Sequence, residues 1–124
     1  LRGKANDKTN IHMKKLFTLF ILTTLMGLVA NGQTSIDVDS LRYTLNSDGT
    51  ATVTSCLYLS TPEITIPQTV NDGTQDYTVT KIAYSVFFYK NFITAITLPD
   101  GLTTIGENVF YGCSSLTTVN IPSV

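Results

Sequence analysis

Very few side chains in this 124-residue sequence are suited to catalysis or to metal binding. The only histidine is His12, and the only cysteines are Cys56 and Cys113. His12 lies in a hydrophilic segment ahead of Met13, which we exclude from the mature protein. The mature chain then has no Ser–His or Cys–His pair and no histidine that could hold a metal. We therefore expect no enzyme activity, no cofactor and no metal centre.

Two pairs of aspartates are the remaining candidates for chemistry. Asp37 and Asp39 would share one face of a strand, and Asp72 precedes Asp76 by four residues. Paired carboxylates can bind calcium or transfer protons. Asp-Gly in the sequences "SDGT" (47–50) and "NDGT" (71–74), however, is far more typical of turns. The sequence also contains no glycine-rich phosphate loop and no stripe of alternating basic and aromatic residues. We therefore assign no catalytic or metal-binding residues.

The stretch "MKKLFTLFILTTLMGLVANGQ" has the three parts of a secretory signal. Two lysines precede an apolar run that begins at Leu16, and Ala30 and Gly32 form a small-x-small cleavage site. The run is shorter than the about 20 residues of a membrane span, which disfavours the alternative of an uncleaved anchor. We assign residues 13–32 to the signal peptide and residues 1–12 to an upstream leader that is not a domain.

The charge of the mature chain restricts its partners. From Gln33 onward there are eight acidic and three basic residues, a net charge of −5. The bases are scattered along the chain at Arg42, Lys81 and Lys90. Such a chain is unsuited to nucleic acid or to an anionic membrane surface.

An internal repeat of 23 residues organises the C-terminal half. It aligns residues 79–99 with residues 102–122 without a gap, and six of the 21 pairs are identical, where chance would give roughly one or two. A period near 23 lies in the range of leucine-rich solenoids. The identical pairs are Thr80/Thr103, Ile82/Ile105, Val86/Val109, Phe87/Phe110, Thr94/Thr117 and Pro99/Pro122.

Alternating apolar and polar residues predict a short strand at the end of each repeat. In "LTTVNIP", Val119 and Ile121 face one side, Asn120 faces the other, and Pro122 ends the strand. The segment "EITIP" (63–67) fits the same column, one coil before "AITLP" (95–99) and two coils before the strand that ends at Pro122. Stacked coils would join these strands into a parallel ladder, to which "GENVFYGC" would return as an irregular or helical turn.

The same alternation divides the ladder residues into an inner and an outer set. We expect the inner set in the core: Ile64, Ile66, Ile96, Leu98, Val119 and Ile121. We predict that the outer set binds a ligand, and we call it the ladder face: Glu63, Thr65, Ala95, Thr97, Thr118 and Asn120. The alternative is that its threonine and asparagine side chains are only solvated residues that suit a strand.

Two hairpins are predicted ahead of the regular repeats. From Pro67 to Pro99 is 32 residues, nine more than the repeat, and "TVNDGTQDYTV" supplies the insertion as a hairpin. A second hairpin, at 41–59, belongs to an N-terminal β cap that covers 33–62. The repeats then occupy 63–124, and we expect a truncated array because the chain stops two residues into the next coil.

The two cysteines could form one disulfide, which export would favour. Cys56 belongs to the cap and Cys113 to the second full coil. At a strand spacing of about 4.8 Å they would lie on the order of 10 Å apart, beyond the roughly 7 Å that a disulfide spans. We expect both to be buried packing thiols.

The pattern Leu-x-x-Ile-Gly-x-x-x-Phe-x-x-Cys-x-x-Leu-x-x-Val-x-Ile-Pro at 102–122 resembles the BspA-like leucine-rich repeat of bacterial surface proteins. The resemblance covers about residues 41–124. It implies a β-dominated leucine-rich-repeat solenoid of stacked parallel strands with short irregular or helical turns, closed by an N-terminal β-hairpin cap. The coil at 79–99 departs from the pattern at three positions: Ala83, Tyr89 and Lys90 stand in place of Gly, Gly and Cys.

The family resemblance also implies a secreted or cell-surface protein, often an adhesin, without catalysis of its own. We expect the ladder face to bind an extracellular protein or glycan. The alternative is a structural spacer that presents a missing C-terminal domain. Nucleic acid is not an expected partner, and no membrane insertion is expected after signal cleavage. The oligomeric state is left open by the sequence.

Signal cleavage is the first testable expectation. Because Ala30 and Gly32 place small residues three and one before Gln33, an exported chain should begin at Gln33. N-terminal sequencing of the secreted product measures this directly. A product that still begins at Met13 would contradict the assignment.

Overall fold

The computed structural model describes residues 33–58 and 61–122, which form nine strands and no helix. The predicted leader (1–12) and signal peptide (13–32) lie outside the described residues. In the part of the chain that is described, no helix is long and apolar enough to cross a membrane. The strands are β1 (Thr34–Val38), β2 (Leu41–Leu45), β3 (Thr50–Cys56), β4 (Glu63–Thr65), β5 (Thr69–Asn71), β6 (Asp76–Ile82), β7 (Ala95–Thr97), β8 (Thr104–Ile105) and β9 (Thr118–Asn120).

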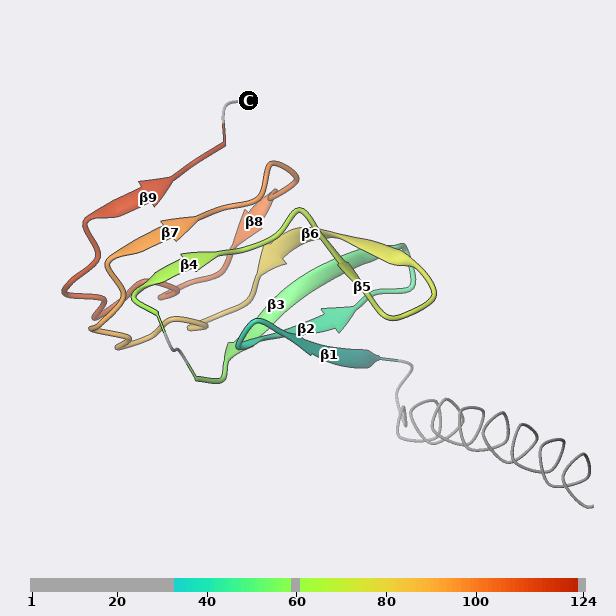
Figure 1. The fold of residues 1–124 in the computed structure, drawn as a ribbon, viewed down its shortest axis with the longest axis horizontal. Coiled ribbons are helices and arrows are strands. Elements are labelled where there is room, and N and C mark those ends of the chain that lie inside the picture. Colours follow the sequence, from blue (N-terminus) through green and yellow to red (C-terminus); the bar gives the residue numbers. More distant parts are fainter. Residues whose placement is uncertain (1–32, 59–60, 123–124) are drawn as a thin grey trace, which may run out of the picture. The chain divides into compact units, whose positions relative to one another are not determined.

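The first of two sheets contains both predicted hairpins. Its strand order is β1-β2-β3-β6-β5, and β8 pairs with β6 (Figure 1). The β2–β3 pair is antiparallel around a turn in which Gly49 has a φ of 81°, a value that glycine adopts without steric cost. The β5–β6 pair is antiparallel as well. Both hairpin predictions are therefore confirmed.

The second sheet consists of three short parallel strands in the order β4-β7-β9, which Figure 1 shows side by side. Its register agrees with the sequence alignment of the repeats. The aligned triplets are Glu63/Ala95/Thr118, Ile64/Ile96/Val119 and Thr65/Thr97/Asn120.

The first sheet also contains a parallel ladder that the sequence analysis did not predict. Strand β3 pairs in parallel with β6, and β6 pairs in parallel with β8. Ala51 and Val53 of β3 are fully buried, as are Val79 and Ile82 of β6, so the inner faces of these strands enter one core. Strand β3, which we had placed in a cap, is thus an arm of a hairpin and also the first member of this ladder.

Hydrogen bonds join consecutive coils outside the strands as well. The turns that lead from the first sheet to the second, residues 83–94 and 106–117, are bonded to each other at alternate residues from 85 to 89. Backbone amides of the earlier turn donate to carbonyls of the later one in three pairs: Ser85 to Glu107 at 3.0 Å, Phe87 to Val109 at 3.1 Å and Tyr89 to Tyr111 at 2.8 Å.

Threonine side chains explain two of the identical repeat positions. The Thr103 hydroxyl donates to the Thr80 carbonyl at 3.1 Å, and the Thr117 hydroxyl donates to the Thr94 carbonyl at 3.3 Å. Each threonine therefore bonds its own equivalent one coil earlier, in addition to a backbone bond between the same residues. A valine at these positions would keep the strand preference but lose the side-chain bond.

The core lies between the two sheets and confirms most of the predicted inner set. Ile64, Ile66, Ile96 and Leu98 are at most 6% exposed. The prediction was wrong for Val119 and Ile121, which are 38% and 74% exposed. Both residues belong to the last described coil, so the preceding coil covers them from one side and no described strand covers the other.

The turns repeat an unusual backbone conformation. Ser85 and its equivalent Asn108 have φ values of 57° and 59°, and Tyr89 and its equivalent Gly112 have φ values of 55° and 76°. Only glycine adopts such values without a steric penalty, which for other residues is about 1–2 kcal/mol. The coil at 79–99 therefore keeps the backbone path of the next coil although Tyr89 replaces glycine.

Gly106 allows the closest approach between the coils. A Cβ at this position would lie 2.6 Å from the Tyr84 nitrogen and 2.7 Å from the Ala83 carbonyl carbon. Both are backbone atoms, which cannot move away without breaking the stack. The Gly106 amide also donates to the Ile82 carbonyl at 2.8 Å. Glycine is therefore required here by space and not by φ.

The β5–β6 turn is held by one carboxylate. Oδ1 of Asp72 accepts hydrogen bonds from the Thr74 amide, the Thr74 hydroxyl and the Gln75 amide at 2.7 to 2.9 Å, and Oδ2 accepts one from the Tyr77 hydroxyl at 3.0 Å. These bonds, the one from the Thr74 hydroxyl first, lower the pKa of Asp72 from 3.8 to about 2. The aspartate forms the turn, as the "NDGT" sequence indicated.

Substitution of Gly106 tests the close approach between coils. Gly106→Ala should lower the free energy of unfolding by about 1–3 kcal/mol, because the added methyl group meets fixed backbone. Gly101→Ala is the matched control, since its Cβ would meet only the Thr78 methyl group at 3.1 Å and the Val79 carbonyl oxygen at 3.5 Å. Urea unfolding measures both variants. Equal losses would show that Gly106 is not a point of close stacking.

The low pKa of Asp72 predicts a pH dependence of stability. The folded-state pKa of about 2 lies below the ordinary value of 3.8, so the carboxylate stabilises the fold above about pH 4 and loses this effect as the pH falls towards 2. Because Asp72 is exposed, we expect less than about 1 kcal/mol. Asp72→Asn should therefore be less stable than wild type near neutral pH, and the difference should shrink in acid. Asp76→Asn controls for the loss of a charge in the same hairpin, and a difference independent of pH would contradict the linkage.

Candidate functional site

The structure brings together the six residues of the predicted ladder face. They lie on one side of the β4-β7-β9 sheet, in two columns of three. Glu63, Thr65, Thr118 and Asn120 are exposed, whereas Ala95 and Thr97 are half-buried because they belong to the central strand. The arrangement of these residues is as predicted, and their role in binding stays a prediction.

The chemistry of the ladder face is polar and weakly charged. Glu63 is its one ionisable residue. The Asn120 side-chain amide donates to the Thr97 hydroxyl at 3.2 Å, so part of the hydrogen-bonding capacity connects neighbouring strands. The exposed oxygens and amide groups of the outer strands leave a flat surface that can hydrogen-bond a protein backbone or a sugar.

A second group of exposed residues lies on the turns and was missed in the sequence. Phe88, Tyr89 and Tyr111 are 42%, 60% and 57% exposed, although aromatic residues of this size are usually well buried. The Phe88 and Tyr111 rings are nearly parallel, with centroids 5.4 Å apart, and the Tyr89 ring is nearly perpendicular to both. The available signal was the pair of aromatic segments "FFY" (87–89) and "VFY" (109–111), each followed by Lys and Asn or by Gly and Cys within the predicted turns.

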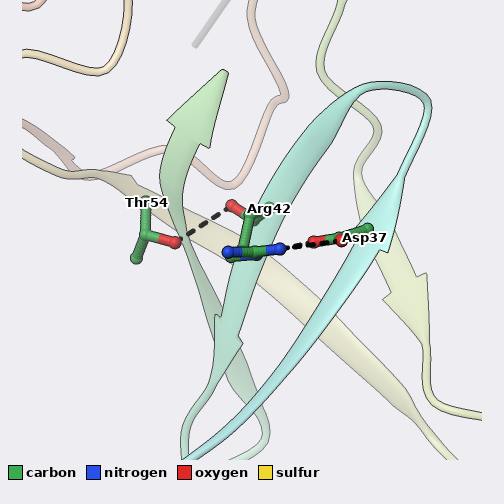
Figure 2. Close-up of polar contacts among 3 residues, drawn as sticks. All are labelled: Asp37, Arg42 and Thr54. Carbon is green, nitrogen blue, oxygen red and sulfur yellow. Dashed lines mark hydrogen bonds and ion pairs between the residues drawn. The ribbon is translucent and has the colours of Figure 1, made fainter. Parts of the chain in front are cut away.

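The first aspartate pair does not form an open carboxylate site. Asp37 of β1 accepts two hydrogen bonds from Arg42 of β2, at 2.8 and 3.0 Å, and the Thr54 hydroxyl donates to the Arg42 carbonyl at 3.2 Å (Figure 2). The bond from Arg42 holds the pKa of Asp37 below its ordinary value, and the same contact raises the pKa of Arg42. Asp39 lies in the β1–β2 turn, where its φ is 47°.

The second pair is engaged in its own hairpin. Asp76 accepts a hydrogen bond from the Asn71 side chain at 2.7 Å, and Asp72 holds the turn as described above. Over residues 33–58 and 61–122, no three His, Cys, Asp or Glu side chains are close enough to hold a metal ion. The predicted turn role is therefore supported for Asp72 by its contacts.

Both cysteines are free and pack against the core, but they are half-buried and not fully buried as expected. The Cys113 thiol donates to the Phe87 carbonyl of the preceding coil at 3.1 Å. Desolvation raises the pKa of Cys56 and of Cys113. Because the thiolate is the reactive form, both are poor nucleophiles at neutral pH.

A hollow of about 270 Å³ opens between the ends of the last two coils. It is lined mainly by apolar side chains, among them Leu98, Leu102, Ile105 and Ile121. The other lining residues are Pro99, Asp100, Thr103, Thr104 and Pro122. This composition supplies a mainly apolar contact surface.

Solved structures similar to this chain are known from Bacteroides and Faecalibacterium species. The chain is similar to a leucine-rich repeat protein from Bacteroides capillosus, with 34% identity and a TM-score of 0.64 over 69% of this chain and 64% of that one. A leucine rich cell surface protein from Faecalibacterium prausnitzii is 38% identical, with a TM-score of 0.63 over 69% of this chain and 23% of that one. A leucine-rich repeat protein from Bacteroides ovatus is 30% identical, with a TM-score of 0.63 over 70% of this chain and 23% of that one.

The chain thus spans 64% of the first of these proteins and 23% of the other two. No curated protein matches it significantly. Residues 80–124 match the sequence family described as the BspA type leucine rich repeat region (6 copies). This match coincides with the 23-residue repeat, the stacked turns and the parallel strands of the structure. Residues 80–124 are therefore a BspA-type leucine-rich repeat region.

Proposed function

We propose that this chain is a secreted or cell-surface binding module, built as a leucine-rich-repeat solenoid, whose ladder face holds an extracellular protein or glycan. The observation that carries the proposal is the unbroken register of β4, β7 and β9. It aligns equivalent outer side chains at the strand spacing of about 4.8 Å, so that a ligand can make the same contact on successive coils. Adhesion would follow from display of this face on the cell surface.

The surface location is supported independently of the ladder face. A relative of 38% identity is a leucine rich cell surface protein. The signal sequence expected at 13–32 would direct this chain to export. The net charge of −5 after Gln33 disfavours nucleic acid and anionic membrane as partners.

The size of the ladder face predicts weak binding for these coils alone. Three strands of three residues offer far less than the about 800 Å² that each partner contributes to a stable protein interface. Affinity should therefore rise with the number of repeats that engage one ligand.

One observation favours the alternative of a structural spacer. The Asn120–Thr97 hydrogen bond and the half-burial of Thr97 show that part of the ladder face stabilises the stack itself. A chain with this arrangement could hold another domain away from the cell without a ligand of its own.

Two lysine substitutions on the outer strands distinguish these functions. Thr65→Lys with Asn120→Lys adds charge on β4 and β9, which are separated by β7, so the lysines do not oppose each other directly. The variant should fold with a change of less than about 1 kcal/mol, because both positions are exposed. Cells that display it should lose retention on plates coated with serum proteins or mucin.

Ser35→Lys with Ser47→Lys is the matched control, since both serines are exposed and lie outside the ladder face. This variant adds the same charge and should retain the cells as wild type does. Equal loss with both variants would remove the ladder face as the binding site. If cells that display the wild-type chain are retained on neither coating, the spacer function is favoured.

A further inference from the structure

Three exposed aromatic side chains form a patch on the turns, away from the residues of the ladder face. We call Phe88, Tyr89 and Tyr111 the aromatic cluster. Their rings are in mutual contact: Phe88 and Tyr111 are 5.4 Å apart at 15°, Phe88 and Tyr89 are 4.6 Å apart at 85°, and Tyr89 and Tyr111 are 5.5 Å apart at 78°. Such contacts fix the ring orientations without burying the rings.

The central member of the cluster is held by a strained backbone. Tyr89 has a φ of 55°, in the region where the equivalent residue of the next coil is Gly112. A glycine would fit this position without penalty, so the aromatic ring is not what the stacking of coils requires. Strain that the fold does not need is a feature of functional positions.

The Tyr89 ring lies with one face on the next coil. A Cβ built on Gly112 would be 2.6, 2.9 and 3.0 Å from the adjacent ring atoms Cδ1, Cγ and Cε1. Nearly equal distances place this point above the ring plane, because an approach along the plane would leave Cγ and Cε1 much farther away than Cδ1. Glycine at 112 thus provides a flat backbone support for one ring face. The 60% exposure of Tyr89 means that much of the rest of the ring is open to solvent.

Hydrogen-bonding groups lie beside the cluster. The Asn91 amide donates to the Tyr89 carbonyl at 2.9 Å, and the Ser114 amide donates to the Gly112 carbonyl at 2.9 Å. In these tight turns the exposed Asn91 follows Tyr89 by two residues, and the exposed Ser114 follows Gly112 by two residues. An open aromatic face beside amide and hydroxyl groups is the chemistry that carbohydrate recognition requires, since a sugar ring has C–H groups on its face and hydroxyls at its rim.

The size of the cluster decides between possible occupants. Exposed fractions of 42%, 60% and 57% leave the three side chains with on the order of 300 Å² of open surface. A protein partner or a second copy of this chain would need about 800 Å², whereas one or two sugar rings need no more than the cluster offers. The net charge of −5 after Gln33 disfavours an anionic polysaccharide.

We propose that the aromatic cluster is a binding site for a neutral carbohydrate, with a pyranose ring stacked on the open face of Tyr89. The Phe88 and Tyr111 rings stand nearly perpendicular to the Tyr89 ring and fix its orientation by packing against it. The site is separate from the ladder face and does not depend on the function proposed for it.

Tyr89→Gly tests this site, because it removes the ring and installs the residue that the next coil has at this position. The probes are neutral hexasaccharides of glucose, mannose, xylose and N-acetylglucosamine, and the measurements are saturation-transfer NMR and calorimetric titration. Wild type should transfer saturation to the C–H protons of at least one probe. Tyr89→Gly should weaken that binding at least about tenfold while its Tm stays equal or rises.

Tyr58→Ala, which removes a 71% exposed tyrosine outside the cluster, should bind the same probe as wild type does. The ladder variant Thr65→Lys with Asn120→Lys should also bind it, so that the two proposed sites fail or succeed separately. The proposal is overturned if no probe binds wild type, or if Tyr89→Gly binds equally well. It is also overturned if Tyr89→Gly clearly lowers the Tm, or if the variant instead abolishes a dimer of the chain seen by light scattering.

Discussion

The constraint on which this structure depends is the direct contact between the backbones of consecutive coils. Parallel strands stack at about 4.8 Å, and the hydrogen bonds between turns continue that spacing outside the sheets, as from Phe87 to Val109. A single coil exposes one side of its apolar residues, so neighbouring coils must approach closely to exclude water. Gly106 shows how close this approach is, because a single added carbon would overlap the backbone of Ala83 and Tyr84.

Columns of equivalent side chains follow from this stacking. When each residue lies over its equivalent in the preceding coil, one favourable contact can be repeated along the array. Thr103 over Thr80 makes a hydroxyl–carbonyl bond, and Phe110 lies parallel to Phe87 at an interplanar angle of 4°. The columns therefore combine polar bonds at the corners with apolar contact inside. A substitution in one coil alters the contacts with both neighbouring coils. Few residue types therefore fit the repeat positions.

Much of this could be predicted from residue types and spacing. The 23-residue alignment specified the β7–β9 register, the match of "EITIP" to the same column placed β4, and Asp-Gly pairs indicated both hairpins. The ladder of β3, β6 and β8 was missed because β3 already had an evident antiparallel partner in β2. The sequence pattern of a strand does not show which strand pairs with its other edge. The exposure of Val119 and Ile121 could not be read from alternation, which tells which side a residue faces but not whether a neighbour covers it.

The irregular coil shows how the fold separates its own requirements from surface chemistry. Cys113 stabilises the stack, because its thiol donates a hydrogen bond to the Phe87 carbonyl of the preceding coil. The equivalent residue of the preceding coil is Lys90. Tyr89 also replaces a residue of the next coil, but its backbone keeps the positive φ of the equivalent Gly112. The stack tolerates this strain because hydrogen bonds on the backbone, here from Tyr89 to Tyr111 at 2.8 Å, hold the path whatever the side chain. Exposed side chains on the turns are therefore free to vary, and these positions are where new binding chemistry can arise without loss of the fold.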